Sequence, residues 1–299
     1  MQQVQVSDEQ LHDVERSYRR ALDARSIDGL NVIGYGEIGL AIAIPTDAPR
    51  AVVKRMAASP DAAMVSDYAA RMDAYQRHLA EHVRIIPTDQ RSIVDDQGWT
   101  VPYMIQPLID STDLCENILA EARPDDEHPV LVALRDVVER VGAITEIGLD
   151  SQVSNFAWVD DELVCLDVGS PLVFDAHGEP DIEIGPYQRA MPAVLNPVLR
   201  RVLIDLTNRM GNTREGLRHA ATSLLRLELD DWLAPALTTF NTVLDEPLEE
   251  ADIRNGFSGI KREMKVVKSF ARVQRAWVTR VRRQPYDFFI TDSFTKEIL

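Results

Sequence analysis

The sequence has few cysteines, few lysines and no long apolar run, and each shortage excludes a class of protein. Its two cysteines, Cys115 and Cys165, are too few for a disulfide framework and lack the spacing of metal ligands. No stretch approaches the roughly 20 apolar residues of a membrane span, and the N-terminus, MQQVQVSDEQ, is polar where a secretory signal would be apolar. These absences predict a cytoplasmic protein without a membrane partner.

Positive charge is also scarce, and it is unevenly placed. The net charge of −16 at pH 7 argues against nucleic acid as a general partner of the surface. Residues 254–283 are the exception, because they carry +9 and leave −25 on the rest of the chain. A basic helix here could dock an acidic partner protein or nucleic acid. The alternative is a terminal helix packed on the acidic body of its own chain.

Lysine is the rarest charged residue, and Lys54 is the only one among the first 260 residues. It lies in AVVKRM, a run that predicts a strand, and an ammonium on the inner face of a small sheet is costly unless an anion meets it. The alternative is an edge-strand lysine that keeps solvent on its side. Candidate partners on the next predicted helix are Asp67, Asp73 and Glu81, and Asp67 is favoured because it flanks the apolar stripe.

The 299 residues are 45% hydrophobic, enough to bury a core in one large domain or two lobes. Up to residue 107 the pattern predicts a helix from Ser7, a small antiparallel sheet and one helix inserted after the third strand. From residue 108 to 299 it predicts mostly helices, including one over residues 129–148, interrupted by a hairpin. The sequence therefore predicts an α+β fold with a β lobe, a helical lobe and a cleft between them.

Three glycines, Gly34, Gly36 and Gly39, form a G-x-G-x-x-G string. A dinucleotide fold would need a helix directly after them, but LAIAIP follows, which predicts a strand. Between two strands, such glycines let a hairpin backbone lie close over a phosphate chain, because no Cβ obstructs the approach. The alternative is an ordinary hairpin with a flexible turn.

The stretch GLDSQVSNFAWVDDELVCLDVG, residues 148–169, has an acid before its first apolar run and another at the end of its second. If the runs pair as a hairpin, Asn155 and Asp167 come to the same end of the ladder. Their oxygens are the ligand type that Mg²⁺ prefers, and Asp150 would then be free to orient or deprotonate a hydroxyl. The alternative is a loop of turn-forming Asp and Asn.

The sequence resembles the protein-kinase-like superfamily, especially its aminoglycoside and choline phosphotransferase branch. The resemblance lies in the order of four motifs: Gly34-x-Gly36-x-x-Gly39, Lys54, Asp150-x4-Asn155 and Asp167-Val-Gly169. The resemblance covers roughly residues 30–175. It implies a kinase-like two-lobed fold that binds ATP and Mg²⁺ and transfers phosphate to a hydroxyl of a small molecule or peptide. The implied N-lobe spans residues 1–107 and the implied C-lobe residues 108–299.

The same resemblance implies a role for each motif residue. The glycine turn would cover the ATP phosphates, and Lys54 would hold the α- and β-phosphates. Asp150 would be the catalytic base, and Asn155 and Asp167 would bind Mg²⁺. The connector Ile105-Gln106-Pro107-Leu108 would offer backbone groups to adenine, so Gln106 and Leu108 join the expected nucleotide site.

The sequence departs from the family pattern in two places. Gly148 stands two residues before Asp150, where the family often has His, and no Glu occupies a natural place opposite Lys54. Two alternatives therefore stay open: a pseudokinase-like module that binds nucleotide or a partner without transfer, and an enzyme that transfers another part of ATP, such as AMP. His78 and His82 stand at i, i+4, but the pair lacks a third ligand in the sequence pattern, which predicts a solvated helix end.

Overall fold

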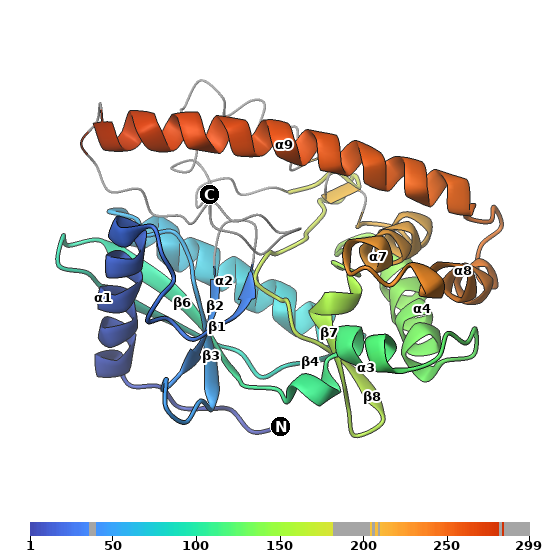
Figure 1. Ribbon diagram of the computed structural model, residues 1–299, viewed down its shortest axis with the longest axis horizontal. Coiled ribbons are helices and arrows are strands. Elements are labelled where there is room, and N and C mark those ends of the chain that lie inside the picture. The colour runs from blue at the N-terminus through green and yellow to red at the C-terminus, as the bar shows by residue number, and fades with distance from the viewer. Residues whose placement is uncertain (36–39, 182–203, 205–206, 209, 281–282, 284–299) are drawn as a thin grey trace.

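The computed structural model describes residues 1–35, 40–181, 204, 207–208, 210–280 and 283, with the side chains of residues 35 and 260–274 outside that description. The chain is an α+β protein built on a five-stranded antiparallel sheet and several helices (Figure 1). The sheet has the strand order β1-β2-β3-β6-β5. Its strands are β1 (Val32–Tyr35), β2 (Leu40–Ile44), β3 (Ala51–Arg55), β5 (Asp89–Val94) and β6 (Thr100–Pro107).

Helix α1 (Asp8–Ala24) begins at the predicted capping box, where Ser7 accepts a hydrogen bond from the Gln10 backbone and the Gln10 side chain accepts one in return. Its apolar face packs against the sheet and joins a core with the inward residues of β2, β3 and β6. The members of this core from α1 are Leu11, Val14, Tyr18, Ala21 and Leu22. We call α1, α2 and the five-stranded sheet the sheet half.

Helix α2 (Ala62–Leu79) is the predicted insertion after the third strand of the sheet. It begins at Asp61, whose side chain accepts a hydrogen bond from the Met64 backbone. Its first turns lie near β6, whereas Tyr75 and Leu79 near its end belong to the core of the other half of the molecule. Helix α2 therefore connects the two halves.

The remaining elements form what we call the helical half. Its helices are α3 (Cys115–Glu121), α4 (Pro129–Gly142), α7 (Thr213–Arg226) and α8 (Leu233–Asn241). A small second sheet, in the order β4-β8-β7, contains β4 (Arg84–Ile85), β7 (Phe156–Val159) and β8 (Glu162–Cys165). The helix predicted over residues 129–148 ends earlier, at Gly142, and Ile147 forms a bridge with Val173 instead.

Helix α9 (Glu250–Arg280) runs along the molecule from the helical half to the sheet half (Figure 1). It packs against α7 and α8, and near its other end Arg275 donates a hydrogen bond to the Leu22 carbonyl of α1. Arg254 forms ion pairs with Asp230 and Glu250. Residues of both halves therefore contact this basic segment.

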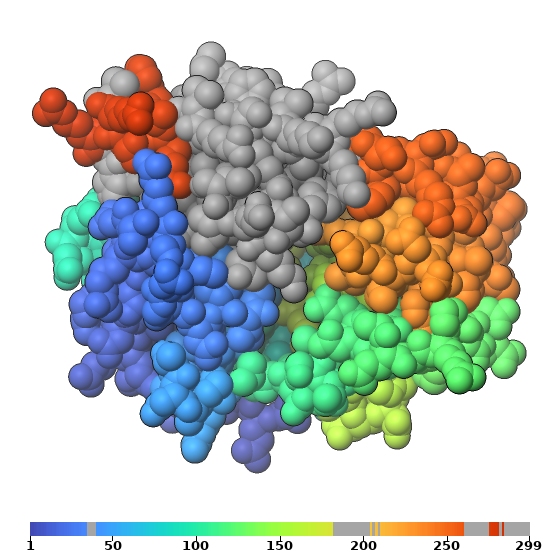
Figure 2. Space-filling model, viewed as in Figure 1, coloured from blue at the N-terminus to red at the C-terminus, as the bar shows by residue number. Residues whose placement is uncertain are grey.

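On the face shown in Figure 2, the residues of α1 and its sheet occupy one side, and those of α4, α7 and α8 occupy the other. Each side has its own large apolar cluster, and a small cluster of Tyr68, Met72 and Met104 lies between α2 and β6. Within the described residues, no helix is long and apolar enough to cross a membrane.

Candidate active site

The hairpin of β7 and β8 forms as predicted and brings distant polar residues together. Phe156 pairs with Cys165, and one step further the Leu166 backbone donates to the Asn155 carbonyl at 2.8 Å. Asp167 follows directly after Leu166. Asn155 and Asp167 therefore lie at the same end of the hairpin, which confirms the geometric prediction made from their spacing.

Lys54 reaches this end of the hairpin from the sheet half. It lies on β3, paired with Ala41 of β2 on one side and with Met104 of β6 on the other. Its Nζ lies 3.3 Å from Oδ1 of Asp167. Both side chains stay partly open to solvent, with 30% of Lys54 and 44% of Asp167 exposed. The lone early lysine thus meets an anion from the other half of the molecule.

The expected pairing of Lys54 with Asp67 is not made. Asp67 lies on the exposed side of α2, and the buried face of that helix carries Tyr68, Met72, Tyr75 and Gln76 instead. The expectation was wrong because Asp67, one position before Tyr68, points away from the sheet. Asp167 supplies the carboxylate that Lys54 needs.

The buried face of α2 donates three hydrogen bonds, two to the loop after β8 and one to the segment before Asp150. Tyr68 donates to the Gly169 carbonyl at 3.2 Å, and Gln76 donates to the Val168 carbonyl at 3.2 Å. Tyr75 donates to the Gly148 carbonyl at 3.0 Å, just before Asp150. These bonds satisfy buried backbone groups, so α2 fixes both the loop that carries Asp167 and the segment that leads to Asp150.

Gly169 lies where this loop comes close to β6. A Cβ on Gly169 would lie 3.0 Å from the Sδ and Cε atoms of Met104, and 3.5 Å from Oδ1 of Asp167. The Gly169 backbone also donates to that same oxygen at 3.4 Å. The Asp-x-Gly spacing therefore has a packing reason in this chain as well as a hydrogen-bonding one.

Asp150 lies in the loop before β7 with its carboxylate three-quarters buried. Gln152 donates to both carboxylate oxygens through its side chain at 3.1 Å, and His219 Nε2 lies 3.1 Å from Oδ1. Burial raises the pKa of Asp150, but the contacts with His219 and Gln152 outweigh this effect and lower the pKa below its ordinary value of 3.8. Asp150 is therefore ionised at neutral pH.

Helix α7 anchors the loop that carries Asp150 along one of its faces. Ser151 donates to the Gly216 carbonyl at 2.6 Å, and the Val153 backbone donates to Ser223 Oγ at 3.0 Å. Arg226 donates to the Gln152 side-chain oxygen at 2.7 Å, so it steadies the residue that binds Asp150.

Sequence reasoning did not identify His219 as part of this site. The available signal was its spacing to Ser223 and Arg226, which places all three on one side of α7. That spacing does not reveal which loop the helix meets, because 69 residues separate His219 from Asp150.

Gly148, the departure from the family pattern, has a packing explanation. A Cβ there would lie 2.7 Å from the Met210 carbonyl oxygen and 3.3 Å from the Phe174 ring. The backbone of Gly148 donates to the Leu172 carbonyl at 2.9 Å. The chain around Met210 and Phe174 thus fills the space that a larger residue would occupy.

The structure describes some of the other expected nucleotide-binding residues, and polar groups of two of them are engaged within the protein. Gly34 lies in β1, opposite Ala41, whereas Gly36 and Gly39 lie outside the described residues. The buried side chain of Gln106 donates to the Leu166 carbonyl at 2.9 Å and to Thr88 at 3.1 Å, so it ties β6 to the chain before Asp167. The Leu108 backbone donates to the Arg50 carbonyl at 3.0 Å, so this donor is engaged within the protein.

The oxygens near Asp167 fit a hard divalent cation and its phosphates. Oδ1 of Asp167 contacts Lys54 and Gly169, while no described residue contacts Oδ2. The Asn155 side chain donates its amide to the Asp150 carbonyl at 3.3 Å, and its amide oxygen has no partner among the described residues. One carboxylate and one amide oxygen are therefore available as Mg²⁺ ligands.

The fold and these contacts describe an α+β protein whose polar site joins a sheet half to a helical half. A family model matches residues 14–275, and the chain belongs to this family, DUF6206, which is a family of unknown function. A search of curated proteins found no match to the chain.

Proposed function

We propose that the protein is an ATP- and Mg²⁺-dependent phosphotransferase acting on a hydroxyl of a small molecule or peptide. The observation that carries the proposal is the ion pair of Lys54 with Asp167 beside the loop of Asp150 and Asn155. Phosphoryl transfer needs a fixed cation at the phosphates, oxygen ligands for a metal ion and a carboxylate at the acceptor hydroxyl. Asp150, Lys54, Asn155 and Asp167 supply these groups.

The arrangement of elements supports a protein-kinase-like two-lobed scaffold for this chemistry. Helix α2 follows the third strand of an antiparallel sheet, and β6 leads into the helical half, where the β7–β8 hairpin carries the polar loop. In this interpretation residues 1–107 form the N-lobe and residues 108–299 the C-lobe. The turn with Gly34, Gly36 and Gly39 would cover the phosphates, and the connector with Gln106 and Leu108 would face adenine, with Leu108 contributing a group other than its engaged N–H.

Each polar residue would then have a defined task. Lys54 would neutralise phosphate oxygens, and Asp167 would hold the ammonium in place before nucleotide binds. Mg²⁺, held by Asn155 and Asp167, would supply further charge neutralisation when bound. Asp150, ionised because its pKa is lowered, would accept a hydrogen bond from the acceptor hydroxyl and orient it for attack.

His219 would be a positioning residue that acts through Asp150. Its Nε2 lies on Oδ1 of Asp150, and Gln152 holds the same carboxylate from the other side. These two contacts limit rotation of the Asp150 carboxylate. The remaining lone pairs of its oxygens therefore stay oriented toward the hydroxyl of the acceptor molecule. The carboxylate then does not have to reorient when the acceptor hydroxyl binds.

The second candidate is a pseudokinase-like module that binds nucleotide or a partner without transfer. The observation that favours it is the buried face of α2, which presents Tyr68 and Met72 near the small central cluster and no carboxylate for Lys54. Lys54 then depends on Asp167 alone among the described residues, and a metal ion would compete for that carboxylate.

A thermal-shift panel of ATP, ADP, AMP and GTP, each with and without Mg²⁺, tests the proposal on wild type and Asp167→Ala. We expect Mg-ATP to raise the melting temperature of wild type and to have little effect on the variant. If Mg-ATP stabilises neither protein, the phosphotransferase proposal is wrong. If it stabilises wild type but no acceptor mixture consumes ATP, the pseudokinase-like alternative is favoured.

A further inference from the structure

The end of helix α2 brings three metal-binding side chains together. The helix ends at Leu79, and the chain then tightens, with the Glu81 backbone donating to the His78 carbonyl at 3.2 Å and the His82 backbone donating to the Leu79 carbonyl at 2.9 Å. Bonds between residues three apart wind the chain more tightly than an α-helix. This turn keeps Glu81 and His82 folded back beside His78.

The donor atoms of these residues are close enough to share one ion. One imidazole nitrogen of His78, one of His82 and one carboxylate oxygen of Glu81 all lie within 4.8 Å of one another. Metal–ligand bonds of about 2.0–2.1 Å in a tetrahedral site put neighbouring ligands about 3.3 Å apart. Small side-chain rotations would close the difference, because Glu81 is exposed and both histidines are half-buried.

The rings of His78 and His82 lie tilted to each other with centroids 5.8 Å apart, and the described residues give the three side chains no polar partner. Among the described residues, none forms a hydrogen bond or ion pair with either imidazole or with the Glu81 carboxylate. The nearby Arg140 of α4 binds the carbonyl of His82 and not its ring. It anchors the turn to the helical half and leaves the imidazole available.

We propose that His78, Glu81 and His82 bind a divalent transition metal ion of the Zn²⁺ class. Two imidazoles and one carboxylate suit Zn²⁺, Co²⁺ or Ni²⁺ better than Mg²⁺ or Ca²⁺, which prefer oxygen ligands. Three protein ligands leave one position for water or another ligand. Glu81, three residues after His78, would supply the third ligand beside the histidine pair.

The position of this site gives the ion a structural role. Directly after His82 the chain enters β4, which pairs in parallel with Val164 and Cys165 of β8, the strand that leads to Asp167. An ion at the turn would fix the end of α2, which connects the two halves, relative to this strand. Metal binding would thus stabilise the fold at the junction, and this holds whether or not the protein transfers phosphate.

Zn²⁺ titration of the full-length protein by calorimetry, with Co²⁺ absorption spectra as a second measurement, tests the site. We expect one Zn²⁺ per chain, a Co²⁺ spectrum typical of tetrahedral coordination and no competition from Mg²⁺. His78→Ala and His82→Ala should each weaken Zn²⁺ binding at least tenfold, and Glu81→Gln by a smaller factor. The control is His177→Ala, which removes an exposed imidazole elsewhere and should leave Zn²⁺ affinity unchanged.

Folding of the variants is checked by melting temperature without metal, which should match wild type because none of the three side chains is buried. Zn²⁺ should then raise the melting temperature of wild type and His177→Ala but not of His78→Ala. Wild type without a bound Zn²⁺ at micromolar concentrations would overturn the proposal. So would a His78→Ala/His82→Ala double variant that keeps wild-type affinity.

Discussion

The ammonium of Lys54 lies 3.3 Å from the Asp167 carboxylate, although the two residues are 113 positions apart and belong to different halves of the molecule. Lys54 is fixed by its place on β3, the central strand of the sheet, which is paired on both sides. Asp167 is fixed by the end of the hairpin and the bonds from α2. The sheet and the hairpin therefore hold the ammonium and the carboxylate close together, as a site for phosphate and metal requires.

Lys54→Met should weaken Mg-ATP binding at least tenfold, because the phosphates lose a fixed cation and Asp167 loses its partner. The measurement is a calorimetric titration of Mg-ATP into each protein. Arg50→Met is the matched control, since Arg50 is an exposed cation directly before the same strand and should leave affinity within twofold. Equal losses in both variants would mean that general positive charge, and not Lys54, attracts the nucleotide.

His219→Ala should lower the rate of phosphate transfer at least tenfold and leave Mg-ATP affinity within twofold. The reason is that His219 contacts Asp150 and neither Lys54 nor Asp167 among its described contacts. His219→Gln, whose amide can also donate to Asp150, should restore part of the rate. Transfer is measured as ATP consumption with an acceptor panel, and a variant that loses nucleotide affinity as strongly as rate would contradict the positioning role.

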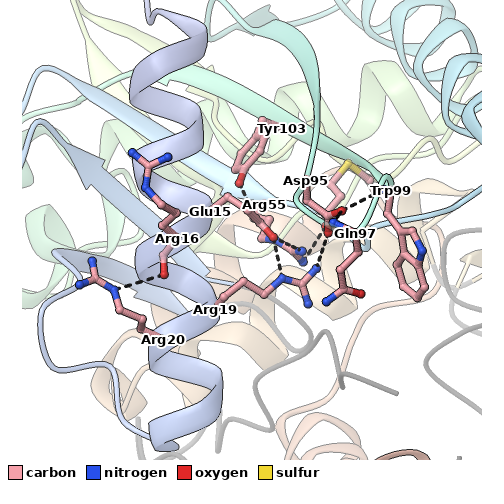
Figure 3. Close-up of polar contacts among 10 residues, drawn as sticks. Glu15, Arg16, Arg19, Arg20, Arg55, Asp95, Gln97, Trp99 and Tyr103 are labelled. Atoms are coloured by element: carbon pink, nitrogen blue, oxygen red, sulfur yellow. Dashed lines mark hydrogen bonds and ion pairs between the residues drawn. The ribbon is translucent and has the colours of Figure 1, made fainter. Parts of the chain in front are cut away.

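Glu15 should make the free energy of unfolding depend on pH in the acidic range. Figure 3 shows Glu15 of α1 among Arg19, Arg55 and Tyr103, with Arg55 bound through both carboxylate oxygens at 2.6 and 2.8 Å. Burial raises the pKa of Glu15, but its bonds and its attraction to Arg55, with those of Tyr103 and Arg19, lower the pKa from 4.5 to about 2. The cluster lies on the opposite face of β3 from Lys54, so it holds α1 against the strand that carries the lysine.

A carboxylate whose pKa is lowered on folding stabilises the fold above its unfolded pKa and loses that contribution as pH falls through the folded one. The stabilisation is therefore complete above pH 4.5 and disappears between pH 4.5 and about 2. Glu15→Gln should cost about 3 kcal/mol of unfolding free energy at pH 7, and the difference from wild type should shrink below pH 4.5.

Urea denaturation at pH 7, 4 and 3 measures this difference. Glu9→Gln, an exposed acid in the first turn of α1, is the control and should cost less than about 1 kcal/mol at pH 7. A Glu15→Gln penalty that stays constant down to pH 3 would show that the loss comes from packing and not from charge.

Gly148→Ala should destabilise the protein by about 1–3 kcal/mol, because the added Cβ meets the Met210 carbonyl oxygen, a backbone atom that cannot rotate away. Gly259→Ala is the control, and it should stabilise the protein instead. Its Cβ meets no atom of the described residues within 4 Å, and alanine favours a helix over glycine by up to about 1 kcal/mol. Thermal and urea denaturation of both variants measure the difference, and a Gly148→Ala protein as stable as wild type would contradict the packing explanation.

Local patterns in the sequence predicted most of the sheet half and the hairpin. The capping box of Ser7, the period-two runs of the strands and the spacing of Asn155 and Asp167 each report on neighbours that are close in sequence. Contacts between distant segments were harder to predict from the sequence. Asp67 was preferred for Lys54 because it flanks the apolar stripe of the next helix, but the carboxylate that Lys54 contacts lies at the end of a hairpin more than a hundred residues later.

Two further features of the chain were not explained by sequence patterns. Gly148 was a sequence departure without an explanation until Met210 and Phe174 were seen to fill the space beside it. The histidine pair of His78 and His82 was interpreted without Glu81, although residues three and four apart share one face at a helix end. Tertiary packing, and not residue periodicity, determines the space beside Gly148.

The central claim is that Asp167 helps to bind Mg-ATP, and calorimetric titration of ATP in the presence and absence of Mg²⁺ tests it most directly. The variant is Asp167→Asn, and the control is Asp161→Asn at the opposite end of the same hairpin, where asparagine tolerates the left-handed backbone. We predict Mg²⁺-dependent ATP binding in wild type and Asp161→Asn, and at least a tenfold weaker interaction in Asp167→Asn. Equal, Mg²⁺-independent binding in all three proteins, or none in any, would contradict the account.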